Sequence, residues 1–549
     1  MPEQSLILAP FSLDLASEAS SIHHRTLLGQ WHQHQGYNSK SFPQKTIDFY
    51  ADCLIRHLSK DGVALRWYED GKLNEIRFTE LHAAVVECAE CWHGNGIEPG
   101  SRVAILCASP LRRTIALLAG FKLGLKISLI PVTGSLLLKQ HLQRLAPDYL
   151  HVDSAYQSWV EEGSPCKAIN RQLHRTLDIG DERSYERDEI VLRLLDPYSE
   201  SEDSVLELRA GYVFERLLHD ALLILELERG YLYAGMSSIS NGVAPFPELS
   251  TLLVGATFFF IEPADWRRHA LDLMQRSVDV VSIPAQARTA LAESGAKVEA
   301  GLWRRWIRNP IESLDYQSWR DFGTLTGLDE VPHADLLYTS QMAGISLGQP
   351  WSTDFLNMGL YTPTATPYHL GDLVNPEAPS ALAHGRLCAI ALVGEEAVVS
   401  PTPFMLTKFD GSFRFVGLYP PGRQGKAYPI SSVLELLATP DAHHAVIEKP
   451  GSEGVESKTY FILTAFNDAR TEEELGLLIQ SRLGEAALPD EILGVPLFPR
   501  LKLNGDVDVD WVSRLYFRGE LALRGNRDFY RAMGAFKHLV YQRLGKRPK

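Results

Sequence analysis

The residues whose types and spacing could carry out chemistry by themselves are few. Cys88 and Cys91 form the single CxxC pair of the sequence, a spacing typical of zinc and redox sites, but no second such pair follows. The sequence also contains three local histidine pairs: His23 with His24, His32 with His34, and His443 with His444. No further ligands accompany these pairs at a recurring spacing. We therefore interpret the cysteines as small residues on a packed helix, interpret the histidines as surface or loop residues, and expect no metal site.

The composition is that of a large, acidic, globular protein. Its 549 residues exceed the size at which one hydrophobic core stops growing, so we expect at least two domains. The apolar fraction of 45% and the charged fraction of 22% are ordinary for globular proteins. The net charge of -14 disfavours nucleic acid and anionic membranes as partners. The sequence has no signal-peptide pattern and no apolar run of roughly 18 residues, so we expect a cytoplasmic protein without a membrane span.

Two stretches of the chain have the pattern of an α/β sheet. The first predicts a helix with Thr79 as its N-cap, a buried strand over 102–107, a helix over 111–122 and a strand over 125–131. Strand, helix and strand in this order indicate a right-handed parallel crossover. The second stretch predicts a helix and a strand within 250–263, a helix over 265–276 and a strand ending at Pro284.

The character of the sequence changes after residue 384. Short strands over 385–417, broken by glycines and by the hairpin signal Asp410-Gly411, predict a small β-rich subdomain. A Pro- and Gly-rich connector leads to a helix within 428–440, strands over 443–450 and 458–466, and a helix over 471–483. We therefore predict an N-terminal arm (1–45), a large α/β domain (46–417), a small α+β domain (418–520) and a terminal amphipathic helix (521–549).

The order of these segments resembles the adenylate-forming (AMP-dependent synthetase/ligase) superfamily, which includes acyl-CoA and aryl-CoA synthetases, fatty acyl-AMP ligases and adenylation domains. The resemblance covers roughly residues 45–520, and it is clearest in four stretches: 78–132, 252–263, 409–447 and 488–508. The resemblance implies an α/β fold with two α/β subdomains and a small β subdomain, followed by a small α+β C-terminal domain.

The nucleotide-binding motifs of that superfamily are altered in this chain. In the superfamily, the phosphate loop is rich in Gly, Ser and Thr and ends in Pro-Lys. In this chain, the corresponding window 201–224 contains one glycine, Gly211, and no lysine. We interpret the loop as deleted. The superfamily's Tyr-Gly-x-Thr/Ser-Glu motif is matched by YTSQMAG, where Tyr338 keeps the ring that stacks on adenine and Met342 replaces the carboxylate that binds Mg2+. A thioether is a poor ligand for this hard cation.

Two further motifs are altered. The Thr-Gly-Asp whose carboxylate binds the ribose has no counterpart shortly before Asp410; Gly371-Asp372 matches part of it, but its position before the predicted strand at 385–390 favours a turn. The Asn-Gly-Lys of the C-terminal loop reads Asn504-Gly505-Asp506, which replaces a catalytic cation by an anion. Each lost electrostatic contact is worth about 3 kcal/mol in a transition state, by analogy with an oxyanion donor. We therefore expect neither ATP nor Mg2+ to bind productively.

The resemblance places the ligand pocket between the two α/β subdomains. By position alone, the candidate substrate-binding residues are Ser240, Asn241, Phe246, Pro284, Asn309, Tyr338, Thr339, Ser340, Gln341, Met342 and Gly344. Phe246 and Pro284 can equally be packing residues, and Asn241 can equally form a turn before Gly242. Arg209 is a cation in the altered phosphate window, so it is a candidate for binding a phosphate or carboxylate, although it can also be a surface residue. No catalytic residue is identified.

Three functions stay open at this point. The first is binding of a carboxylic acid or acyl thioester within a biosynthetic pathway, with ATP-dependent adenylation lost. The second is a non-catalytic scaffold or regulator, with a carrier protein or biosynthetic enzyme as partner. The third is an active AMP-forming ligase with remodelled phosphate contacts. Prolines at 420 and 421 restrict the backbone just after Gly417, where the superfamily has its hinge, so we also predict a single inter-domain arrangement.

Overall fold

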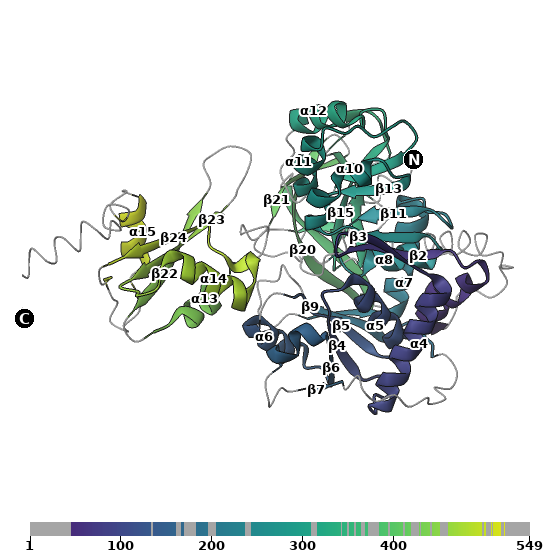
Figure 1. Ribbon diagram of the computed structural model, residues 1–549, viewed down its shortest axis with the longest axis horizontal. Coiled ribbons are helices and arrows are strands. Elements are labelled where there is room, and N and C mark those ends of the chain that lie inside the picture. The colour runs from purple at the N-terminus through teal and green to yellow at the C-terminus, as the bar shows by residue number, and fades with distance from the viewer. Residues whose placement is uncertain are drawn as a thin grey trace, which may run out of the picture. The chain divides into compact units, whose positions relative to one another are not determined.

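The structure is a computed structural model of the 549-residue chain, shown in Figure 1. It describes residues 46–132, 135–160, 166–169, 183–195, 205–235, 243–308, 316–341, 343–348, 351–355, 358, 360–363, 368–371, 384–393, 396–409, 412–418, 428, 430–439, 442–450, 459–496, 499–500, 507, 509–517 and 521. The predicted N-terminal arm, the predicted hinge after Leu418 and nearly all of the predicted terminal helix lie outside these residues.

The first α/β stretch forms the predicted parallel crossover. Strand β4 (Arg102–Leu106), helix α5 (Pro110–Lys122) and strand β5 (Lys126–Leu129) follow one another, and β4 pairs in parallel with β5. After α6 (Ser135–Leu145), strand β6 (Tyr149–Val152) adds to the other side of β4. The sheet of six strands has the order β10-β9-β5-β4-β6-β7, in which β7 is Lys167–Ala168, β9 is Ile190–Leu195 and β10 is Val205–Arg209. The prediction of an α/β fold from this stretch is confirmed.

Helix α4 (Phe78–Gly94) begins earlier than predicted, so the N-cap assigned to Thr79 is wrong. Arg77 is the N-cap because it ends strand β3 (Lys72–Arg77) in an extended conformation, and its backbone N–H donates to the Glu80 carboxylate at 2.9 Å. The Thr79 hydroxyl instead donates to Asp61 at 2.6 Å. Cys88 and Cys91 lie on this helix, half-buried, in agreement with their interpretation as packing residues.

The second α/β stretch contributes five parallel strands to a larger sheet (Figure 1). They are β11 (Leu232–Gly235), β12 (Thr257–Phe260), β13 (Val278–Ile283), β14 (Trp303–Arg308) and β15 (His333–Thr339). Helices α8 (Phe246–Leu253), α11 (Ala285–Glu293) and α12 (Tyr316–Thr326) connect them. The single helix predicted over 265–276 is instead two, α9 (Pro263–Arg268) and α10 (Ala270–Met274), because His269 has a non-helical backbone at φ -123°.

The β-rich segment continues the same sheet. Strands β16 (Gly344–Gly348) and β17 (Leu360–Pro363) link β15 to β21 (Ser412–Leu418), which pairs with β20 (Glu396–Phe409), β19 (His384–Val393) and β18 (Tyr368–Gly371) in turn. Phe409 pairs with Ser412, so β20 and β21 form an antiparallel hairpin, while Asp410 and Gly411 of the predicted turn lie outside the described residues. The β subdomain is thus hydrogen-bonded to the parallel strands, and the whole sheet has 13 strands.

The two α/β stretches share one hydrophobic core. The core includes Val85 and Phe121 from helices of the first stretch, together with Leu249 and Phe258 from the second, and all four are fully buried. A second core lies around Trp306 and is rich in tryptophan. Burial of a large apolar side chain stabilises the folded state by about 1.5–3 kcal/mol, so the shared core holds the two sheets as one body.

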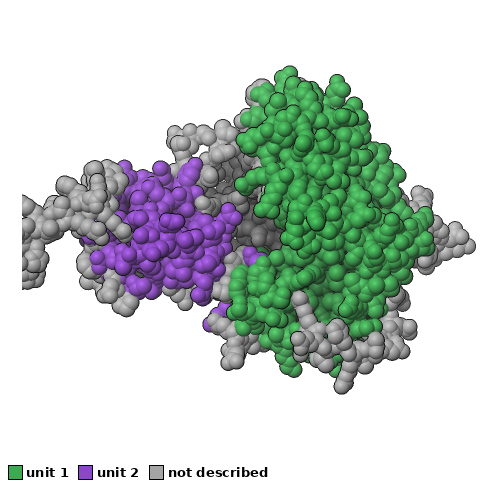
Figure 2. Space-filling model, in the orientation of Figure 1, with its two compact units in different colours: residues 1–131, 141–420 green, residues 132–140, 421–549 purple. Residues whose placement is uncertain are grey.

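The chain divides into two compact units, coloured separately in Figure 2: residues 1–131 with 141–420, and residues 132–140 with 421–549. The second unit contains a sheet of order β22-β23-β24, formed by β22 (His443–Pro450), β23 (Thr459–Phe466) and β24 (Glu491–Val495). Helices α13 (Ile430–Leu437), α14 (Glu472–Leu483) and α15 (Val509–Phe517) complete it. The predicted helices and strands of this α+β region are confirmed; the helix predicted over 471–483 is α14, and Thr471 is its N-cap.

The described residues contain neither a membrane-spanning helix nor a cluster of metal-binding side chains. None of the helices described is both long and apolar enough to span a membrane. Within the same residues, no three His, Cys, Asp or Glu side chains form a group that could hold a metal ion.

Candidate functional site

Polar side chains gather at the carboxyl ends of the parallel strands β11, β13 and β15, where sheets of this kind bind their ligands. Tyr233 of β11 and Tyr338 of β15 are both buried, and their hydroxyl oxygens lie 3.1 Å apart. Ser282 of β13 also forms a hydrogen bond with Tyr233. These hydroxyls come from three strands that are far apart in the sequence and adjacent or nearly adjacent in the sheet.

The hairpin between β15 and β16 lies at this edge. Thr339 pairs with Gly344, and the Ala343 N–H donates to the Ser340 carbonyl at 3.0 Å, which closes the turn. Thr339, Ser340 and Gln341 are at most 4% exposed. Gly344 has φ +152°, a backbone conformation that residues with a Cβ rarely adopt. The hairpin is therefore a tight, buried turn.

Helix α7 (Ala210–His219) holds the hairpin from the side. It follows β10 (Val205–Arg209) directly and continues into η3 (Asp220–Ile224), one turn of π-helix, a rare element that is frequent at functional sites. The Ile345 N–H donates to Asp220 Oδ2 at 2.8 Å, and Arg216 Nη2 donates to the Ile345 carbonyl. Tyr212 Oη also donates to the Gln341 carbonyl at 3.5 Å.

Burial shifts the titration of these groups. It raises the pKa of Asp220 to about 7, against the opposing effects of the Arg216 cation and the Ile345 N–H. Burial also raises the pKa of Tyr212 and Tyr233 to about 12, and that of Tyr338 well above its usual value. The tyrosines therefore stay neutral at physiological pH and act only as hydrogen-bond donors and acceptors, whereas Asp220 can exchange a proton there.

The structure brings together several of the predicted site residues. Five of them lie in the hairpin or beside it: Tyr338, Thr339, Ser340, Gln341 and Gly344. Phe246 begins helix α8 and is fully buried in the shared core. Pro284 is the half-buried N-cap of α11. Four others lie outside the described residues: Ser240, Asn241, Asn309 and Met342.

Arg209 has a structural contact instead of a free guanidinium. It is the N-cap of α7, and its Nη1 donates to the Asp188 carbonyl at 2.5 Å. Sequence reasoning did not identify Arg216, Asp220 or Tyr233. The signal that could have found the first two is their spacing: two oppositely charged residues four apart in a helical run lie on one face and can pair.

The window in which the phosphate loop was expected is regular structure from residue 205 onwards. Strand β9 (Ile190–Leu195) and β10 form an antiparallel hairpin in which Leu195 pairs with Val205. The segment between them lies outside the described residues, and its sequence is DPYSESEDS. It contains four carboxylates and neither glycine nor lysine. The charge of this connection is the opposite of what a phosphate requires.

Comparisons with known proteins give short sequence matches and long structural ones. No family model matches the chain. The acetyl-coenzyme A synthetases of Shewanella amazonensis and Novosphingobium aromaticivorans are 33% identical over 89 residues and 32% identical over 88 residues. These matches cover 16% and 15% of this chain, and the chain spans only 14% of the length of each relative.

Solved structures match most of the chain. The o-succinylbenzoate CoA synthetase of Bacillus subtilis has a TM-score of 0.64 at 13% identity, covering 84% of this chain and 97% of that one. The amide bond synthetase of Marinactinospora thermotolerans has a TM-score of 0.62 at 15% identity, covering 86% and 100%. An artificially fused adenylation–PCP di-domain from Klebsiella oxytoca has a TM-score of 0.64 at 13% identity, covering 87% and 98%.

Each of these structural matches covers at least 84% of this chain. The chain has the fold of the adenylate-forming superfamily.

Proposed function

We propose that this protein binds a carboxylic acid or acyl thioester in the cleft region of the adenylate-forming fold and has lost ATP-dependent adenylation. The observation that carries the proposal is the buried hairpin of residues 338–345. At the position of the superfamily's adenine- and magnesium-binding motif, the Tyr338 hydroxyl is hydrogen-bonded to that of Tyr233. Tyr338 is 4% exposed, and Thr339 and Ser340 are each 1% exposed.

Mg-ATP does not fit the residues at this position. An aromatic ring that stacks on adenine needs one free face, whereas Tyr338 belongs to the shared hydrophobic core. Met342 occupies the place of the metal-binding carboxylate, and a thioether does not replace an oxygen ligand of Mg2+. The hairpin connection DPYSESEDS and Asp506 add negative charge where the superfamily supplies phosphate-binding N–H groups and a lysine.

Retention of the framework supports a ligand of the superfamily's substrate class. The parallel strands keep their carboxyl edge, with Tyr233, Ser282 and Asp220 beside the hairpin. Hydroxyl groups and one carboxyl group can position a polar ligand without any phosphate contact. A matched solved structure is an adenylation–PCP di-domain, so a carrier protein that presents a thioester is the partner we propose.

A second candidate function is a non-catalytic scaffold. The burial of residues 338–341 favours it, because side chains that fill a former nucleotide site leave no room for chemistry there. An active ligase is the third, and the contact of Arg209 with the Asp188 carbonyl gives it no support.

The first test is calorimetry and ATP–pyrophosphate exchange with Mg-ATP, alone and with a panel containing acetic, octanoic, benzoic and amino acids. The acetyl-coenzyme A synthetase of Shewanella amazonensis, assayed with acetate, is the positive control. We expect neither binding in the micromolar range nor exchange. Acid-dependent pyrophosphate release would overturn the loss of adenylation.

The second test is thermal melting with the same acids and with their coenzyme A thioesters. A ligand at 100 times its Kd should stabilise the protein by about 2.7 kcal/mol, a shift that melting detects. If no acid or thioester moves the melting temperature, the scaffold is the better description.

A further inference from the structure

The peptide of Ile345 is held by two side chains of helix α7 and η3. Asp220 accepts the Ile345 N–H at 2.8 Å, and Arg216 donates to the Ile345 carbonyl. Among the described residues, strand β17 pairs with Leu347 and Gly348 of β16 and not with Ile345. Arg216 and Asp220, four residues apart, thus form hydrogen bonds with the carbonyl and the N–H of Ile345, the two backbone groups that a neighbouring strand would otherwise pair with.

Gly344 shows how closely the carboxylate fits. A Cβ at this position would lie 2.1 Å from Asp220 Oδ2, closer than any real Cβ contact. The carboxylate therefore occupies the space of a side chain on the hairpin. A shift of either group moves the other, because interiors are close-packed.

The groups that face the Asp220 carboxylate come from every element around it. Arg216 Nη2 of α7 lies 3.4 Å from Oδ1, and His219 Nδ1, at the end of α7, lies 3.0 Å from it. The hydroxyls of Tyr212, Tyr233 and Tyr338 come from α7, β11 and β15. Helix α8, which also packs on η3, carries Glu248, but this carboxylate pairs with Arg113 at 3.6 Å.

We propose that Asp220 is a positioning residue for the site, and that the gain or loss of its proton sets how firmly the hairpin of residues 338–345 is held. Asp220 acts through Ile345 and Gly344 and need not touch a ligand. The claim that the hairpin serves a ligand rests on the proposed function. The claim that Asp220 stabilises the hairpin does not.

The direction of the effect follows from linkage. In the closed hairpin the carboxylate is desolvated and its pKa is raised to about 7, whereas an opened hairpin returns it to water and to an ordinary value near 4. The closed state therefore binds more protons between these values. Opening becomes easier as the pH rises from about 4 to about 7, and the hairpin is held most firmly when Asp220 is protonated.

Hydrogen exchange of the whole protein tests this directly. Overlapping peptides that differ by Ile345 are compared between pH 5 and pH 7, with rates corrected for intrinsic chemistry. Linkage predicts that the protection of the Ile345 amide falls about 50-fold over this range if Asp220 is fully hydrated in the open state. The Leu232 amide is the internal control, since it donates at 2.8 Å to Asp279, a half-buried carboxylate of the same unit.

Three variants test whether Asp220 is the group whose titration causes the pH dependence of Ile345 protection. Asp220→Asn keeps an acceptor for Ile345 and should remove the pH dependence, whereas the matched Asp279→Asn should keep it. His219→Gln should also keep it, because Asp220 is the group that we invoke. A change in protection of less than threefold in the wild type, or equal dependence in Asp220→Asn, would overturn the proposal. If Asp220→Asn does not fold, the wild-type comparison of Ile345 with Leu232 still decides.

Ligand binding is a separate arm of the experiment. Any acid or thioester of the melting panel that binds is titrated at pH 5 and pH 7 with the wild type and with Asp220→Asn. We expect its Kd to change with pH at least fivefold more in the wild type than in the variant. If no compound binds, the proposed function fails while the exchange measurement still settles the role of Asp220. If a compound binds with equal pH dependence in both proteins, Asp220 does not position the ligand site.

Discussion

Each unit of the molecule contains an aspartate that contacts one arginine and one histidine, and the two aspartates titrate in opposite directions. In the first unit, Asp220 contacts Arg216 and His219, and its pKa is raised to about 7. In the second unit, Asp468 contacts Arg470 and His444, and its pKa is held well below its usual range. The residue types alone therefore do not decide the charge state.

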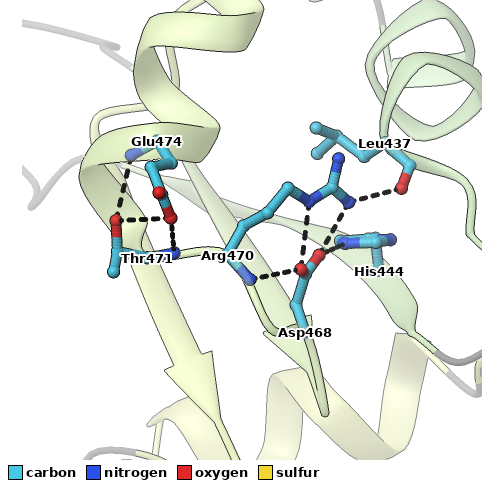
Figure 3. A network of polar contacts seen from close by, with 6 residues as sticks. All are labelled: Leu437, His444, Asp468, Arg470, Thr471 and Glu474. Atoms are coloured by element: carbon cyan, nitrogen blue, oxygen red, sulfur yellow. Dashed lines mark hydrogen bonds and ion pairs between the residues drawn. The ribbon is translucent and has the colours of Figure 1, made fainter.

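The number of well-placed donors differs between the two clusters. Burial by itself would raise the pKa of Asp468, but four donors more than offset it (Figure 3). Arg470 supplies its Nε at 3.0 Å, its Nη2 at 2.8 Å and its backbone N–H at 2.9 Å, and His444 Nε2 lies at 2.7 Å. Because a carboxylate only accepts, His444 Nε2 carries a proton in this contact.

Asp220 accepts the Ile345 N–H at 2.8 Å and lies 3.0 Å from His219 Nδ1, but its contact with Arg216 is long at 3.4 Å, because that guanidinium also donates to the Ile345 carbonyl. Charge stabilisation is thus shared with a backbone group and falls short of the desolvation cost. The comparison teaches that a bidentate pair makes a fixed charge, whereas a shared guanidinium leaves a group that can exchange a proton.

The largest effect is expected from a methyl group placed against Asp220. Gly344→Ala brings a Cβ to 2.1 Å from Oδ2 at a φ of +152°, so we expect a loss of about 3–5 kcal/mol in the stability of the first unit. Denaturant unfolding measures it. Gly295→Ala, at φ +66° with nothing within 4 Å, controls for backbone strain.

The double variant Asp220→Ala with Gly344→Ala separates the clash from other causes. Removal of the carboxylate makes room for the methyl group, so the two changes should couple by at least about 1 kcal/mol. If the stability losses of the two single variants simply add, the clash between the new methyl group and the Asp220 carboxylate is not the cause of the loss in Gly344→Ala.

Loss of the bidentate pair in the second unit should have the next largest effect. Arg470→Ala removes two side-chain donors from Asp468 and one from the Leu437 carbonyl, so we expect this unit to lose about 2–4 kcal/mol. Hydrogen exchange of strands β22 and β23 in the whole chain measures the loss. Gln480→Ala, at an exposed position of α14, should change it by less than about 0.5 kcal/mol.

The pH dependence should have opposite signs in the two units. Asp468 stabilises its unit above pH about 4, and this contribution is lost as the pH falls below that value. Asp220 contributes most below pH about 4, and its contribution declines as the pH rises to about 7. For each aspartate, the free energy of unfolding changes by at most about 1.4 kcal/mol per pH unit. Asp468→Asn and Asp220→Asn should each remove the pH dependence of stability only in their own unit. A variant that changes the pH dependence of both units would contradict the comparison.

The smallest effect concerns the cap that adjoins the Asp468 cluster. Thr471 Oγ1 accepts the Glu474 N–H at 3.2 Å, and the Glu474 carboxylate accepts the Thr471 N–H at 2.7 Å (Figure 3). Thr471→Ala should destabilise the second unit by about 1 kcal/mol without changing its acid profile. Ser481→Ala near the other end of α14 is the control, and a shifted acid profile in Thr471→Ala would show that the two clusters act as one.

Elements whose signals are local could be predicted from the sequence. Helix α14 begins after Thr471 because a threonine followed by Glu474 supplies its own cap. The β4–α5–β5 crossover and the hairpin of β20 and β21 likewise depend on neighbouring residues. The break at His269 was missed, because the apolar period runs through it while one residue departs from helical geometry.

The candidate site was predicted only in part. The stretch of residues 338–344 was found because its letters resemble a known motif. Its partners Arg216 and Asp220 were not, since 125 residues separate Asp220 from Ile345 along the chain. Tyr233 was missed for the same reason, because a tyrosine in an apolar strand is ordinary until its partner is known.

The sequence by itself determined the elements, their order, the superfamily's fold and the altered residues at its nucleotide motifs, because periodicity, caps and motif letters are properties of short segments. The tertiary structure decided that the β-rich strands join the parallel sheet and that Arg216 and Asp220 take the Ile345 peptide. It also decided the opposite charge states of Asp220 and Asp468. Desolvation and donor geometry depend on which distant groups meet, and only the folded chain brings them together.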